Sequence, residues 1–114
     1  MSKRDAWSKF GAIHKWMVPV VVANLVYSTG TPTVQAQAGA GIASITDTGT
    51  GDMRIVFDEA MPDANYVCLG SANTQGDHVV SFGDKTTAQV DANIETSDTL
   101  ADIGFDLAIF LTNG

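Results

Sequence analysis

Hydrophobic and polar residues alternate along most of the chain after Pro19, with the two-residue period of a strand that is buried on one side. The cleanest alternation is in residues 86–96, where one side carries Ala88, Val90, Ala92 and Ile94. Other short extended runs occupy residues 18–27, which are apolar on both sides, and residues 33–38, 43–47, 52–57, 66–69, 78–82 and 105–111. Gly, Asn, Asp and Thr residues separate the runs, as is typical of turns. The pattern predicts an all-β protein, an antiparallel β-sandwich of about seven strands.

The best-defined part of this pattern is a β-hairpin followed by a corner. Residues 43–47 and 52–57 are extended runs, and the Thr-Gly-Thr-Gly segment at 48–51 supplies the positive φ angles that a tight connection needs. On the second run, the residues expected to face the core are Met53, Ile55 and Phe57. Pro62 and Asp63 then favour a type I turn, and residues 66–69 form the next strand.

These same residues carry a resemblance to a known family. Residues 44–46, the pair Gly49 and Gly51, Phe57 and residues 61–66 together resemble a small β-sandwich domain of tail-fibre and related virion proteins of tailed bacteriophages. The similarity covers residues 25–110 in outline and is strongest over residues 44–70. It implies a structural or adhesive protein of the virion, without catalytic residues, that assembles as a homo-oligomer, a trimer, and contacts other virion structural proteins.

The amino-terminal residues follow a different pattern. Hydrophobic residues recur there at three- and four-residue spacing, at Ala6, Trp7, Phe10, Ile13 and Met17, and Pro19 ends the pattern. The sequence therefore predicts a helical or irregular arm at residues 1–17, followed by a sandwich domain at residues 18–114.

The arm combines aromatic and basic side chains, which are the residue types that anchor interfaces. We expect it to dock onto a partner protein through Arg4, Trp7, Lys9, Phe10, Lys15 and Trp16. Packing of the arm on its own domain is the alternative. Residues 18–27 are apolar on both sides, so we expect this strand to be covered on both faces, by the arm or by another subunit.

Two other interpretations of the first residues fit less well. A signal peptide would explain the basic start, but the Ala-Gln-Ala site at 36–38 lies too far from the apolar run. A membrane span needs about 20 apolar residues, and residues 16–27 are too few and include Pro19 and Asn24.

The charge of the protein is unevenly distributed. The formal net charge is -7 for 114 residues, with four basic residues against Asp5 in residues 1–15 and two against twelve carboxylates in the remainder. An acidic body is a poor partner for a phosphate backbone, so we expect no nucleic-acid partner. A chain of this length forms one domain with one core.

The sequence shows no sign of enzymatic chemistry. It contains no Gly-x-Ser-x-Gly, phosphate-loop, dinucleotide-binding or His-Glu-x-x-His motif, so we expect no enzyme and no cofactor. Cys68 lies in a predicted strand and is interpreted as a core residue. Asp47 and Asp52 flank the Gly-rich turn, where they either ligate calcium or only cap the turn.

Polar loops between strands are the expected recognition sites of a rigid sandwich. The candidate recognition loop contains Asn73, Thr74, Gln75 and Asp77, and its expected ligand is a glycan or protein of the host surface. The function we expect is of the tail-fibre or host-recognition type. A capsid decoration or cement protein and a carbohydrate-binding module are the alternatives.

Overall fold

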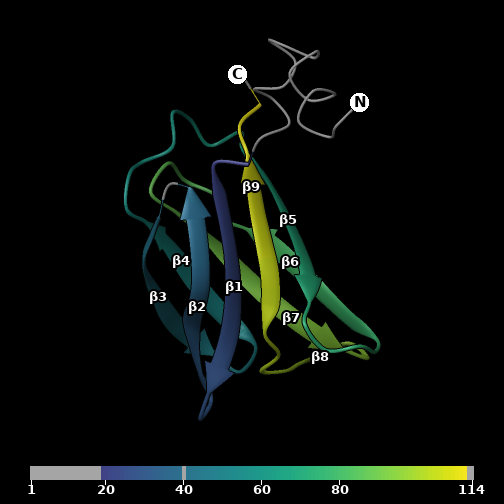
Figure 1. Ribbon diagram of the computed structural model, residues 1–114. Coiled ribbons are helices and arrows are strands. Elements are labelled where there is room, and N and C mark those ends of the chain that lie inside the picture. The colour runs from purple at the N-terminus through teal and green to yellow at the C-terminus, as the bar shows by residue number, and fades with distance from the viewer. Residues whose placement is uncertain (1–18, 40, 113–114) are drawn as a thin grey trace, which may run out of the picture.

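The computed structural model describes residues 19–39 and 41–112, and within these ranges the chain forms strands and no helix (Figure 1). The nine strands are β1 (Val21–Ser28), β2 (Thr31–Gly39), β3 (Ile42–Gly49), β4 (Asp52–Phe57), β5 (Val67–Ala72), β6 (His78–Gly83), β7 (Gln89–Thr96), β8 (Thr99–Leu100) and β9 (Phe105–Phe110). They form two antiparallel sheets. We call the one ordered β2-β1-β9-β5 the front sheet, and the one ordered β3-β4-β7-β6, with β8 beside β7, the back sheet. The predicted antiparallel β-sandwich is confirmed, with nine strands in place of about seven.

The core lies between the sheets and is built by alternate residues of the central strands. Strand β4 buries Met53, Ile55 and Phe57, as its two-residue pattern predicts. Strands β1, β7 and β9 alternate in the same way, and their buried residues are Val21, Ala23, Leu25, Val90, Ala92, Ile94, Phe105, Leu107 and Ile109. Ala88 is the exception to the predicted run, because it lies in the turn before β7 and is exposed.

A β-bulge in β2 changes which residues face the core. Leu25 of β1 pairs with Val34, but its neighbour Asn24 pairs with Ala36, so Gln35 is an extra residue in the ladder. Val34 packs against the core while Ala36 is exposed. A two-residue period over the run at residues 33–38 places Val34 and Ala36 on one face, and this expectation is wrong because the bulge reverses the alternation between them.

Strand β1 is covered on one face by the described residues. Val21 and Leu25 are completely buried, whereas Val22 is 41% exposed on the outer face of the front sheet. The described residues cover the inner face, whereas the arm and any other subunit, which were expected to cover the outer face, lie outside the described residues. The outer face of this sheet is turned toward the viewer in Figure 1.

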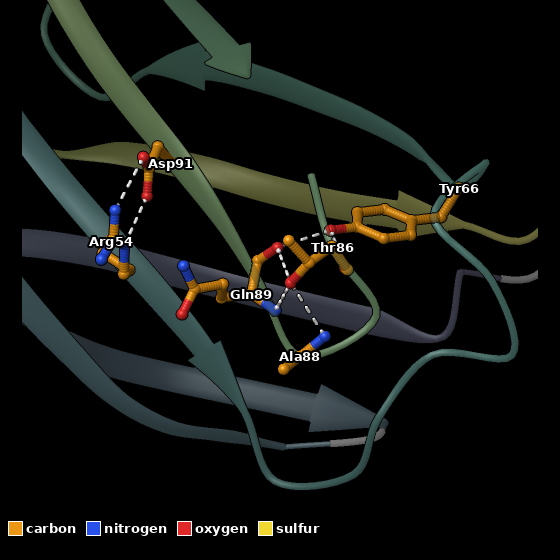
Figure 2. A network of polar contacts seen from close by, with 6 residues as sticks. All are labelled: Arg54, Tyr66, Thr86, Ala88, Gln89 and Asp91. Atoms are coloured by element: carbon orange, nitrogen blue, oxygen red, sulfur yellow. Dashed lines mark hydrogen bonds and ion pairs between the residues drawn. The ribbon is translucent and has the colours of Figure 1, made fainter. Parts of the chain in front are cut away.

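Tyr66 joins the corner before β5 to the turn before β7 (Figure 2). Its ring is completely buried, and its hydroxyl donates to a pair of carbonyl oxygens, at 2.8 Å from Thr86 and 2.9 Å from Gln89. The Thr86 hydroxyl accepts from the backbone N–H groups of Ala88 and Gln89, both at 3.2 Å. Lys85 donates to the Tyr66 carbonyl at 2.8 Å and lies 5.5 Å from the ring centre. These contacts fix one end of the sandwich.

We predict that Tyr66→Phe lowers the free energy of unfolding by about 1–2 kcal/mol, because the Thr86 carbonyl loses the phenol as its donor and the Gln89 carbonyl keeps the Thr86 N–H but loses the phenol. Tyr27→Phe is the matched control, since the buried Tyr27 hydroxyl has no hydrogen-bond partner among the described residues. That change should leave stability equal or slightly higher. Urea unfolding of both variants measures the difference, and equal losses would contradict the assigned role of the Tyr66 hydroxyl.

Stability should also decline at alkaline pH. Burial raises the pKa of Tyr66 to about 12, and burial together with the nearby carboxylates of Asp102, Asp47 and Asp52 raises the pKa of Tyr27 to about 12. The folded protein therefore holds both phenol protons more tightly than the unfolded chain does, whose tyrosine pKa is 10.0.

The contribution of these two tyrosines to the free energy of unfolding is complete below pH 10 and is lost as the pH rises from 10 to about 12. Urea unfolding measured across this interval should show the decline. A chain carrying both Tyr27→Phe and Tyr66→Phe should lose less stability over the same interval. A decline of equal size in that double variant would assign the effect to other groups.

Candidate functional site

The outer faces of the two sheets have different chemistry. On the back sheet, Arg54 of β4 pairs with Asp91 of β7, with 2.8 Å between Nε and Oδ1 and 3.3 Å between Nη2 and Oδ2 (Figure 2). The guanidinium group holds the pKa of Asp91 below its usual value. On the front sheet, the outer face instead exposes Val22, Val67 and Leu69, the last at 57%. The front sheet therefore exposes three large apolar side chains, whereas the back sheet exposes two, Val79 and Leu100, together with an ion pair and with Glu95 between the two.

A hollow of about 540 Å³ lies on the outer face of the front sheet, and we call it the outer groove. Its outward-facing side chains come from all four strands of the front sheet and are Val22, Asn24, Ala36, Leu69, Ser71, Asp106 and Ala108. The groove is hollow because the small side chain of Ala108 lies between the larger Val22 and Leu69, and Ala36 and Ser71 in the next row are small as well. A concave, mostly apolar surface with a few polar groups is typical of a binding site.

The strand register arranges the groove in two rows. Val22, Ala108 and Leu69 are neighbours across β1, β9 and β5 and form an apolar row. The next row along the strands contains Asn24, Asp106 and Ser71.

Asn24 and Asp106 form the polar contact of the groove. Asn24 donates from Nδ2 to Oδ1 of Asp106 at 2.6 Å, and Asp106 carries the one charged side chain in the lining. The groove can therefore take apolar side chains beside a single carboxylate.

Sequence reasoning did not identify the outer groove, although part of its signal was present. Residues 18–27 are apolar on both sides, and this predicted that something covers the strand. The contributions of Leu69 and Ala108 could not be predicted, because their place beside Val22 depends on the strand order β1-β9-β5.

The candidate recognition loop joins β5 to β6, and all of its residues are exposed. The backbone N–H of Asn73 donates to the Gly104 carbonyl at 2.9 Å, and its side chain donates to the Leu25 carbonyl at 3.1 Å. Asp77 accepts a hydrogen bond from the Ser97 hydroxyl at 3.3 Å. Asn73 and Asp77 thus hold the loop in place, and Thr74 and Gln75 lie exposed between them.

The turn at residues 48–51 is built from local hydrogen bonds. Oδ1 of Asp47 accepts from the Gly49 N–H at 3.1 Å, which is the turn-capping arrangement. The Gly51 N–H donates to Oδ1 of Asp102 at 2.7 Å, so this turn is tied to the segment before β9. In residues 19–39 and 41–112, no group of three or more His, Cys, Asp or Glu side chains is placed to hold a metal ion. The capping role of Asp47 is what the structure shows.

The remaining chemically distinctive side chains have structural surroundings. Cys68 packs partly buried against the core, and burial raises the pKa of its thiol to about 11, so the thiol is protonated at neutral pH. Nδ1 of His78 lies 2.7 Å from the Thr96 hydroxyl. The docking residues predicted in the arm lie outside the described residues and are Arg4, Trp7, Lys9, Phe10, Lys15 and Trp16.

The chain was compared with protein families, curated proteins and solved structures. No family model, no curated protein and no solved structure matches the chain. Across the described segments, the search for a helix of sufficient length and apolar character to cross a membrane finds none.

Replacement of Gly51 tests how tightly the turn at residues 48–51 packs against the segment before β9. It has a φ of +66°, and a Cβ atom there would meet the backbone N of Ala101 at 2.5 Å and its O at 2.6 Å. We predict that Gly51→Ala lowers the free energy of unfolding by several kcal/mol. The backbone strain alone costs about 1 kcal/mol, and the collision with the Ala101 backbone adds to it.

Gly49→Ala is the control for this prediction. Gly49 has a φ of +149°, but a Cβ atom there would meet nothing within 4 Å, so only the backbone strain applies. Its loss of stability should be the smaller of the two in thermal and urea unfolding. The reverse order would show that Ala101 does not confine Gly51 in solution.

Proposed function

We propose that this protein is a non-enzymatic structural component of a tailed-phage virion, of the tail-fibre or host-recognition type. In this proposal the β-sandwich is an oligomeric module that docks to a larger assembly through its amino-terminal arm. Loops at the other end of the domain contact a glycan or protein of the host surface. The resemblance of residues 44–70 to domains of such proteins supports the virion assignment and the trimer.

The arrangement of the two ends of the domain is the observation that carries the proposal. The described chain begins at Pro19 beside the start of β1, and the backbone N–H of Val20 donates to the Ile109 carbonyl at 2.8 Å. Strands β1 and β5 run away from this end, so the β5–β6 loop lies at the opposite end of the sandwich (Figure 1). A module attached at its amino-terminal end would therefore present the exposed Thr74 and Gln75 outward.

The rigidity of that presenting end also suits recognition. Four connections there are joined by three hydrogen bonds, from Gly51 to Asp102, from Asn73 to Gly104 and from Ser97 to Asp77. Fixed loops lose little conformational entropy when they bind a ligand. Such loops are a suitable frame for a recognition surface on a sandwich.

Location in the particle tests the assignment. Antibodies raised against the recombinant full-length chain should label the tail of intact phage particles in immunogold electron microscopy. Label spread over the capsid would favour the decoration-protein alternative, and the absence of the chain from purified particles would refute a virion role. A chain lacking residues 1–17 should fail to enter particles, and normal incorporation would refute the anchoring role of the arm.

The recognition loop has its own test. We predict that the double variant Thr74→Ala, Gln75→Ala weakens binding of the full-length protein to host cells, because these side chains form the exposed part of the loop. Thr87→Ala is the matched control, since Thr87 is exposed at the opposite end of the sandwich. Binding measured by flow cytometry should fall only in the double variant. Unchanged binding would remove residues 74 and 75 from the contact.

A further inference from the structure

We propose that the outer groove is the binding surface for residues 1–17 of the same chain, which fold back over the front sheet. This inference does not depend on the proposed function, because it concerns a contact within the isolated protein. It assigns the apolar stripe of the arm to its own sheet and leaves the basic side chains for docking to the assembly. It rests on an unpartnered apolar face, on the place where the described chain begins, and on the composition of the segment that precedes it.

The outer face of the front sheet, which contains the groove, exposes apolar surface that the described residues leave open. Val22 is 41% exposed, Val67 43% and Leu69 57%, and all three lie on the outer face of one sheet. Burying a large apolar side chain against such a surface contributes about 1.5–3 kcal/mol. A segment that covers this face would therefore stabilise the protein substantially.

The amino-terminal segment has the matching pattern and size. Its apolar residues recur at helical spacing, and in a helix one stripe would carry Ala6, Phe10, Ile13 and Met17. A helix over residues 6–17 would be about 18 Å long, and a strand of six residues such as β9 is about 20 Å long. One short helix therefore spans the front sheet along its strands.

The start of the described chain places this segment next to the groove. Val20 is still bonded to Ile109 of β9, and Val22, two residues later, lines the groove. Pro19 immediately before is a residue that favours turns. Because the arm is covalently attached, its effective concentration at the groove is of millimolar order, which favours the arm of the same chain over that of another.

Charge is complementary as well. Four basic residues lie in the arm, whereas Asp106 is the charged residue in the groove lining and the rest of the chain is strongly acidic. With the apolar stripe against the sheet, Lys9 would border the stripe and could approach Asp106, whereas Arg4 and Lys15 would point away from it. A docked arm would thus keep basic side chains available for a second contact.

The two tryptophans make this inference measurable, because both lie in the arm and none lies in residues 19–112. In a full-length Trp16→Phe chain, Trp7 is the one indole, and its position borders the apolar stripe. We expect its fluorescence emission at short wavelength, with protection from quenching by acrylamide. In the Trp7→Phe chain, Trp16 borders the opposite edge of the same stripe, so we expect a similar emission and a similar protection from acrylamide.

A charge in the groove should release the arm. Leu69→Asp in the Trp16→Phe chain should shift the Trp7 emission to longer wavelength and raise acrylamide quenching. Val79→Asp is the control, because Val79 is 56% exposed on the back sheet and so matches Leu69 in exposure. Far-UV circular dichroism verifies that each variant keeps its β-structure, and unchanged Trp7 emission in a folded Leu69→Asp chain would overturn the proposal.

Mixing distinguishes the arm of the same chain from that of a second copy. The Trp16→Phe, Leu69→Asp chain is mixed with an excess of a full-length Trp7→Phe, Trp16→Phe chain whose groove is intact. If each arm binds its own groove, the Trp7 emission stays at long wavelength. A return to short wavelength would show that the arm binds the groove of another copy and would overturn the assignment to the same chain.

Discussion

The structure depends on one constraint, the burial of alternate side chains from two sheets in a shared core. Leu25 and Leu107 of the front sheet and Ile55 and Ile94 of the back sheet are almost completely excluded from solvent. Extended strands direct successive side chains to opposite faces, so the burial of one set sends the intervening set outward. This division between inward and outward side chains determines which residues lie on both outer faces and at both ends of the domain.

The two outer faces carry different kinds of outward side chain. The back sheet places Arg54 and Asp91 outward, where water and an ion pair accommodate them. The front sheet places Val22, Leu69 and Ala108 outward in one row, which leaves an apolar surface open among the described residues. Large exposed apolar patches on small proteins are usually interaction sites. This difference in the outward side chains is the reason for proposing the front sheet as the docking face.

Prediction from the sequence succeeded where local signals agree. Strand β4 and the glycine turn before it follow from residues 48–57 alone, because two-residue alternation and positive-φ glycines are local properties. The strand β8 was missed because two residues are too few to show a period. Asn73 was assigned to recognition, yet its side chain holds the Leu25 carbonyl, a contact between residues 48 positions apart.

The sequence by itself determined the fold class, the inward residues of β4, β7 and β9, and the turn chemistry, because strand period and backbone freedom act over a few residues. Only the tertiary structure decided the bulge at Gln35 and the groove that joins Val22 to Ala108 and Leu69. Strand order and register set these features, and both come from packing the whole core. Side chains distant in the chain therefore become neighbours for reasons that no short segment contains.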